Sequence, residues 1–224
     1  MSYLQWAFGI AGAALQLLVV SALARGAYKT FPILFAYVIT LFLTTVMDAA
    51  AVFGSGDRAE ASRNLYWIND AIRQLFIFCL VISLIDRTMG NSPRRPALRR
   101  WLVLVLLLLA VLSFYMLKEP FLGLWLTRVS RNLSFCAVIL NLILWAALIR
   151  YKQPDQRLLL VSGGLGIQMT GEAIGQSLRQ LSRSTELAGN LILVLAHLLC
   201  LYIWWQAFRS SGEKLDLAAA RQQH

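Results

Sequence analysis

The sequence predicts an all-α integral membrane protein, a bundle of about seven transmembrane helices with the N-terminus outside and the C-terminus in the cytoplasm. Of the 224 residues, 58% are hydrophobic and only 14% are charged, whereas soluble domains carry roughly 25% charged residues. The apolar residues form seven long runs, and Lys and Arg gather in alternate loops between them. Residues 1–208 are therefore expected to form one membrane domain, and residues 209–224 a short cytoplasmic tail.

Each apolar run is about as long as the 20 or so residues that a helix needs to cross a bilayer. The first run has no charged start and no cleavage site, so it is expected to be a retained helix and not a signal peptide. The fourth is the most apolar and is expected to face lipid, whereas the third and sixth are the least apolar and are expected near the bundle centre. The predicted spans are 4–24, 31–53, 65–85, 100–117, 130–150, 158–180 and 187–208.

The orientation follows from the distribution of basic residues, because cytoplasmic loops carry an excess of Lys and Arg. The uncharged N-terminus lies on the poorer side, which has five basic loop residues (Arg58, Arg63, Lys118, Arg128 and Arg183) and three more just inside helix ends. The richer side is predicted to be cytoplasmic, and its thirteen basic residues are Arg25, Lys29, Arg87, Arg94, Arg95, Arg99, Arg100, Arg150, Lys152, Arg157, Arg209, Lys214 and Arg221.

The formal net charge of +10 would suggest nucleic acid as a partner of a soluble domain. In this chain the basic residues flank apolar runs, so the expected partners are the lipid bilayer and anionic lipid at the cytoplasmic basic loops, and not nucleic acid. Localisation in a bacterial inner membrane as a multi-pass protein is the expectation. The three cysteines all fall inside apolar runs, which argues against a disulfide framework.

Polar side chains inside the predicted spans form stripes along single helix faces. Gln168, Glu172, Gln176 and Arg179 follow a spacing of four, four and three residues, so they share one side of the sixth helix. Depth along the helices brings the charged residues together in the outer half of the membrane, where they predict either a structural ion-pair network or a pocket open to the outside. The candidate ligand-binding or ion-pair cluster comprises Asp48, Trp67, Asn69, Asp70, Arg73, Arg131, Glu172, Gln176, Arg179, Asn190 and His197.

Three of these features have two interpretations. Glu172 is expected to pair with Arg73 or Arg131, unless it is a protonated carrier group. His197, near mid-membrane, is either a packing histidine or a proton relay or ligand contact. The G-x-x-x-G pair formed by Gly171 and Gly175 predicts close helix packing within the monomer, with a homodimer or a partner membrane protein as the alternative.

Motifs for phosphate, dinucleotide and metalloprotease chemistry are absent from the sequence. A haem held by two histidines is not expected, because the second histidine is the terminal His224. Zinc is not expected either, because Cys and His do not cluster at the spacing of zinc ligands. We therefore expect no cofactor, no metal and no catalytic residues.

Short motifs carry a resemblance to a protein family. They are Phe31-Pro32 with Phe35-Ala36-Tyr37, Tyr66-Trp67, and Arg131 with the segment from Leu142 to Trp145. In these motifs the chain resembles uncharacterised bacterial seven-helix inner-membrane proteins. The resemblance implies the same topology, and it implies no particular activity. Seven helices with an outside N-terminus are also found in microbial rhodopsins, but Leu191 to Gln206 contains no lysine to hold retinal.

Together these features predict a non-enzymatic membrane protein that binds a ligand or partner from the outer side, as a sensor or an accessory subunit. The alternative is a small proton- or ion-coupled transporter that uses Glu172, Asp70 and His197. A membrane-embedded enzyme acting on lipid is the third hypothesis, with Asp48 and Glu172 as its acid/base pair. A polar path that continues to the cytoplasm would favour transport, and a path blocked on the inner side would favour binding.

Overall fold

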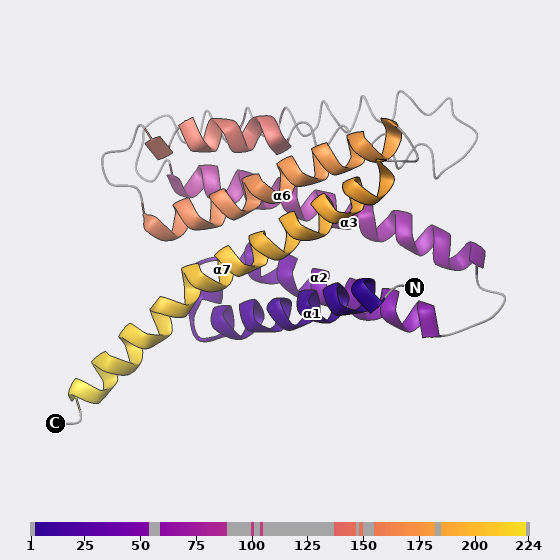
Figure 1. The fold of residues 1–224 in the computed structure, drawn as a ribbon. Coiled ribbons are helices and arrows are strands. Elements are labelled where there is room, and N and C mark those ends of the chain that lie inside the picture. The colour runs from indigo at the N-terminus through magenta and orange to yellow at the C-terminus, as the bar shows by residue number, and fades with distance from the viewer. Residues whose placement is uncertain are drawn as a thin grey trace. The chain divides into compact units, whose positions relative to one another are not determined.

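The computed structural model describes residues 3–53, 59–88, 100, 104, 137–146, 148–149, 155–181 and 185–222. These residues are helical apart from short turns, with no strand in the described ranges, so the predicted all-α class is confirmed for them (Figure 1). The chain divides into two compact units, residues 1–45 with 153–224 and residues 46–152. The predicted fourth helix, 100–117, lies outside the described residues except for positions 100 and 104.

The first unit contains α1, Tyr3–Ala24, and the beginning of α2, which spans Pro32–Phe53. A short 3-10 helix, η1, Ala27–Lys29, connects them. Gly26 begins this connection with a φ of 126°, a left-handed backbone that only glycine adopts without strain. Pro32 occupies the first helical position of α2, where its missing N–H costs no hydrogen bond.

The same unit contains the hairpin of α6, Gln156–Leu181, and α7, Glu186–Gln222. The Asp155 carboxylate caps α6 by accepting a hydrogen bond from the backbone N–H of Arg157 at 3.0 Å. The Thr185 hydroxyl donates to the Leu178 carbonyl at 2.7 Å and ties the start of α7 to the end of α6. Helix α7 packs against both α6 and α1, and the hairpin is seen in orange and yellow in Figure 1.

The second unit contains the end of α2, the helix α3, Ala59–Thr88, and a helical segment, Ala137–Ala146. The buried residues of α3 recur at helical spacing, from Gln74 through Ile77, Val81 and Leu84 to Thr88, so that one face of the helix is buried. Helix α3 begins six residues before the predicted position 65. Its first residues are good helix formers, which extend a helix beyond its apolar part.

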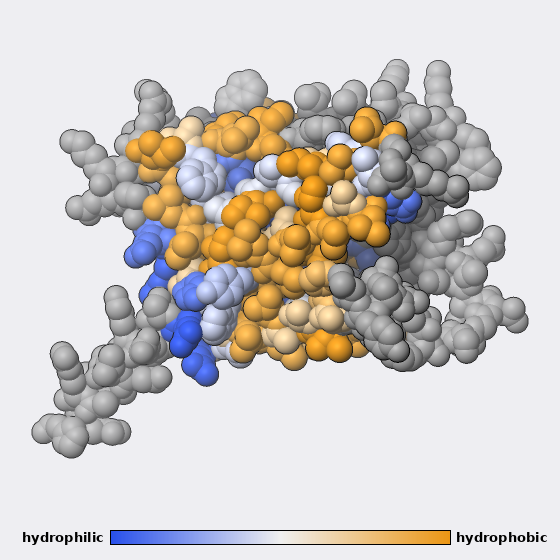
Figure 2. All heavy atoms as spheres, viewed as in Figure 1, coloured by the Kyte–Doolittle hydropathy of each residue, from blue (hydrophilic) through white to orange (hydrophobic). Residues whose placement is uncertain are grey.

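Three of the described helices are long and apolar enough to cross a membrane, over Ala7–Ala24, Gln156–Arg179 and Glu186–Arg209. Pro32–Met47 and Ala137–Ala146 are shorter apolar helices. Figure 2 shows that the described surface in this view is mostly hydrophobic. Large hydrophobic side chains such as Ile10 and Leu187 are exposed, as expected of helices that face lipid. The chain is therefore a membrane protein by the character of these helices.

Candidate functional site

The polar stripe predicted on α6 runs from the core of the first unit to its surface. Gln168 is 1% exposed and Glu172 is 9% exposed, whereas Gln176 is half-buried and Arg179 is exposed. The charged and polar groups therefore become accessible toward the C-terminal end of α6. This is the end that the sequence predicts to lie on the outer side of the membrane.

At the buried end of the stripe, Gln168 connects α6 to α2. Its side-chain amide donates one hydrogen bond to the Tyr37 hydroxyl oxygen at 2.9 Å and another to Oε1 of Glu172 at 3.3 Å. Glu172 follows Gln168 by four residues, so one helix face presents both side chains. Oε1 of Gln168 is buried and has no hydrogen-bond partner among the described residues. The Tyr37–Gln168–Glu172 cluster thus retains a buried acceptor that can still receive a donor.

A second polar cluster connects α1, α2 and α7. The amide of Gln16, which is 2% exposed, donates to Oγ1 of Thr45 at 3.2 Å. The same nitrogen lies 3.5 Å from Nε2 of His197. For His197 to accept a hydrogen bond from Gln16 at Nε2, the proton of the neutral imidazole must be on Nδ1. Thr45 in turn donates to the Leu41 carbonyl at 2.9 Å. Oε1 of Gln16 has no hydrogen-bond partner in the described part of the chain.

The two clusters lie at different depths along α2, the helix that contributes to both. Thr45 follows Tyr37 by eight residues on α2, a rise of about 12 Å at 1.5 Å per residue, and both side chains lie on the same face. The first unit therefore contains two levels of buried polar side chains.

Aromatic rings fill the core between the Tyr37–Gln168–Glu172 cluster and the N-terminal ends of α2 and α6. We call Phe31, Tyr37, Trp204 and Phe208 the aromatic plug. Tyr37 and Trp204 meet edge to face with their centroids 5.9 Å apart, and Phe31 and Phe208 do so at 5.4 Å. The Trp204 indole N–H donates to the Val161 carbonyl at 3.0 Å, and Trp204 is completely buried.

Few polar atoms interrupt the plug among the described residues of this unit. Ser162 is completely buried, but its hydroxyl donates to the Leu159 carbonyl of its own helix at 3.1 Å. Leu34, Leu165 and Leu201, on the helices that contribute to this core, are also completely buried. The plug therefore separates the buried polar clusters from the end of the unit where α6 begins.

The G-x-x-x-G pair of α6 packs against α7 within the chain. A Cβ atom at Gly175 would lie 2.5 Å from Cγ of Leu193 and 2.9 Å from the carbonyl oxygen of Gly189, and one at Gly171 would overlap Ala196. The absence of side chains at these glycines lets the two backbones approach closely. The interpretation of the pair as a packing motif inside the monomer is confirmed, and a homodimer or a partner membrane protein stays a prediction.

The exposed part of the α6 stripe lies beside the beginning of α7. A Cβ at Gly189 would lie 2.9 Å from Cγ of Arg179, so the arginine stem crosses α7 at this position. Asn190, the next residue, is exposed. The structure therefore brings Arg179 close to the end of α7 that carries Asn190.

The other predicted site residues belong to the second unit or lack a described side chain. Asn69 and Arg73 are half-buried on α3. Asp48, Trp67 and Asp70 lie in described helices, but their side chains are outside the described residues, as is Arg131 altogether. The predicted cluster that joins these residues to Glu172, including its ion pair, stays a prediction.

Several residues of the two buried clusters and of the aromatic plug were not predicted as site residues. Gln16 has a sequence signal, because it is an amide within the otherwise apolar run 7–20. Thr45 and Gln168 are polar residues inside predicted spans, and Gln168 belongs to the predicted stripe. Tyr37 and Trp204 have no such signal, because aromatic residues of predicted spans are equally expected in a core or at a membrane interface.

Comparison with known proteins gives no family to which these clusters can be related. The chain matches no protein-family model, no curated protein and no solved structure. The functional proposal therefore rests on the geometry of the described residues.

Proposed function

We propose that this chain is a non-enzymatic, multi-pass membrane protein that binds a ligand or partner from the outer side, as a sensor or an accessory subunit. In this proposal it crosses a bacterial inner membrane about seven times, with its N-terminus outside and its C-terminus in the cytoplasm. The three long apolar helices and the gathering of basic residues in alternate loops support this topology.

One observation carries the binding hypothesis: the α6 stripe is accessible at one end and closed at the other. Arg179 and Gln176 are reachable at the predicted outer end, Glu172 and Gln168 continue the stripe inward, and Trp204 with its neighbouring rings closes it. In this proposal a ligand or a partner side chain contacts the stripe at Gln176 and Arg179, where the side chains are accessible. The buried, unpartnered Oε1 of Gln168 is a further acceptor at the inner end of the stripe.

The rival hypothesis is a proton- or ion-coupled transporter. The hydrogen-bonded position of His197 beside Gln16 supports it, because a histidine connected to other polar groups can relay a proton. Transport also requires a route to the cytoplasmic side. The aromatic plug opposes such a route through the first unit, because Trp204 and Phe208 are buried and pack against the rings of Tyr37 and Phe31.

Cysteine accessibility tests the two hypotheses directly. In a background with the three native cysteines replaced by alanine, single cysteines are placed at Gln176, Ser162 and Arg157, and a membrane-impermeant maleimide is applied to right-side-out and inside-out vesicles. We expect Gln176→Cys to react from the outer side, and Ser162→Cys, which lies at the plug, to react from neither. Arg157→Cys is the control for access from the cytoplasmic side.

Two results would overturn the binding hypothesis. Labelling of Ser162→Cys from the cytoplasmic side would reveal a water-filled route through the plug and favour transport. A proton flux through proteoliposomes of the wild-type protein that disappears in Glu172→Gln would do the same. The absence of both, together with labelling of Gln176→Cys from outside, supports binding.

A further inference from the structure

Four basic residues of the first unit lie at one end of its helices. Arg25 follows α1, Lys29 belongs to η1, Arg157 is in the first turn of α6, and Arg209 follows Phe208 on α7. The ring contact between Phe31 and Phe208 places the start of α2 at this level of α7. We call Arg25, Lys29, Arg157 and Arg209 the basic collar.

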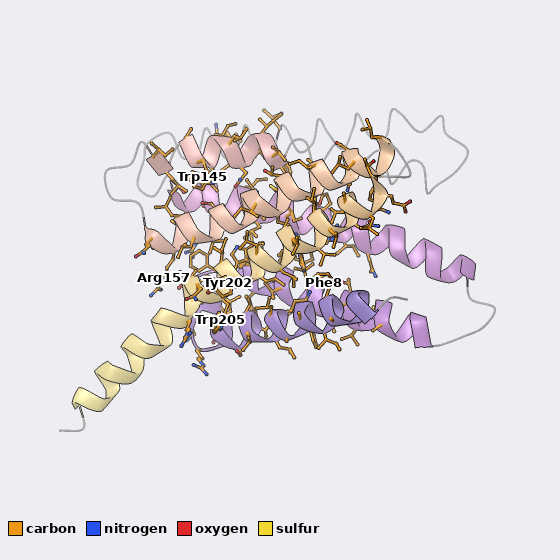
Figure 3. The ribbon with its side chains drawn as sticks, viewed as in Figure 1. Phe8, Trp145, Arg157, Tyr202 and Trp205 are labelled. Carbon is orange, nitrogen blue, oxygen red and sulfur yellow. The ribbon has the colours of Figure 1, made fainter. Side chains whose placement is uncertain are left out.

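The start of α6 lies at the same level, because the Trp204 indole N–H donates to the Val161 carbonyl, one turn beyond Arg157. Figure 3 labels Arg157, Tyr202 and Trp205 at the same end of the unit, and Figure 2 shows hydrophilic residues at this end. All four members of the basic collar therefore belong to a single end, opposite to the one that carries Arg179.

Each collar residue lies where an apolar helix ends. Arg25 directly follows the apolar stretch Ala7–Ala24, and Arg209 is the last residue of the stretch Glu186–Arg209. Arg157 is the second residue of the apolar stretch of α6, and Lys29 precedes α2 by three residues. At these positions side chains reach the level of lipid head groups when the helices span a bilayer.

Aromatic rings hold two of the cations at that level. The guanidinium carbon of Arg209 lies 5.0 Å from the ring centroid of Trp205, and Nζ of Lys29 lies 5.9 Å from that of Tyr28. Trp205 also packs against Tyr202, with centroids 5.9 Å apart. Tyrosine and tryptophan are typical of the membrane interface, where the ring contacts acyl chains and the polar edge contacts head groups.

The positive charges of the basic collar are only partly offset by carboxylates. Within the described part of the chain, the acidic side chain next to it is Asp155, whose carboxylate accepts the backbone N–H of Arg157 as a helix cap. Arg25, Lys29 and Arg209 are exposed, and Arg157 is half-buried. Four cations beside Asp155 and Glu213, which follows Arg209 by four residues on α7, still leave an excess of positive charge at head-group depth, which an anionic phosphate complements.

We propose that the basic collar binds the phosphate groups of anionic membrane lipids. The guanidinium groups of Arg157 and Arg209 bind phosphate oxygens, and Trp205 and Tyr28 contact the glycerol and the first acyl carbons. This site is independent of the ligand site at the other end of α6. It also does not depend on which side of the membrane the collar faces.

Lipid titration of the full-length protein in an uncharged detergent tests the proposal. Phosphatidylglycerol, phosphatidylcholine or inorganic phosphate is added, and bound lipid is counted by native mass spectrometry. We expect phosphatidylglycerol to bind in preference to phosphatidylcholine. The apparent affinity should fall about fivefold for each cation removed, equivalent to roughly 1 kcal/mol, so that Arg157→Gln with Arg209→Gln weakens it by about 25-fold.

Arg221→Gln is the matched control, because it removes one arginine charge from the same helix that carries Arg209, about three turns beyond the end of its apolar stretch. It should leave the affinity for phosphatidylglycerol within about twofold of wild type, while circular dichroism confirms that every variant is folded. An unchanged affinity in the double variant, or equal binding of phosphatidylcholine, would overturn the proposal. Equal competition by inorganic phosphate would overturn the assignment to lipid. None of these results bears on the ligand site, whose test is the accessibility of Gln176→Cys.

Discussion

The seam between α6 and α7 gives the sharpest prediction, for the substitution Gly175→Ala. The added Cβ would lie 2.9 Å from the carbonyl oxygen of Gly189 and 2.5 Å from Cγ of Leu193, and real Cβ atoms essentially never approach other atoms more closely than 3.0 Å. Leu193 can change rotamer, but the Gly189 oxygen belongs to the backbone of α7. The two helices must therefore move apart for alanine to fit.

Two effects of opposite sign set the magnitude. Alanine is favoured over glycine in a helix interior by about 1 kcal/mol. An extra carbon in a packed interior typically costs about 1–3 kcal/mol, and this contact lies at the severe end because a backbone atom is involved. We therefore expect Gly175→Ala to lower the free energy of unfolding by about 1–2 kcal/mol.

The control is the same substitution at Gly9, which lies in α1 with no atom within 4 Å of its added Cβ. Gly9→Ala should be neutral or stabilising by up to about 1 kcal/mol. Unfolding of both variants in mixed detergent and SDS micelles, followed by circular dichroism, measures the difference. If Gly175→Ala proves as stable as Gly9→Ala, the close approach of α6 and α7 at this seam is wrong.

Three further predictions follow from the plug, the predicted ion pair and the topology. Trp204→Phe should destabilise the protein by about 1 kcal/mol, because it removes the hydrogen bond to the Val161 carbonyl, and Trp204→Ala should cost about 3–5 kcal/mol in a denaturation series. If Glu172 pairs with Arg73, Glu172→Gln and Arg73→Gln should each lower the melting temperature, with a cost of about 3–5 kcal/mol, whereas unchanged melting in both would exclude that pair. A reporter fused after His224 should behave as cytoplasmic, and a periplasmic signal there would reverse the predicted orientation.

The sequence predicts the bounds of some helices more accurately than those of others. The predicted spans 4–24 and 31–53 agree with α1 and α2 to within a residue at each end. The span predicted to end at 208 continues as helix α7 to Gln222. Hydropathy locates the part of a helix that lipid can surround, and the backbone continues wherever the following residues favour helix, as Glu213 and Ala218–Ala220 do.

The candidate site was predicted in part. The spacing of Gln168, Glu172 and Gln176 predicts a shared face, and the structure has that face running from the core to the surface. The partners of that face were not predicted, because the sequence of α6 contains no information on which helix its face meets. The amide of Gln168 reaches Tyr37, 131 positions away along the chain.

The sequence by itself determined the membrane class, the positions of the main helices, the polar stripe of α6 and the small residues of its seam. Each of these is a property of one helix, which composition and a period of 3.6 residues express directly. Only the tertiary structure decided that Gln16 meets Thr45 and His197, that Tyr37 meets Gln168, and that four aromatic rings close one end. Those contacts depend on how each helix is rotated about its axis and which helix it packs against. Many side chains fix that choice together, and no single segment encodes it.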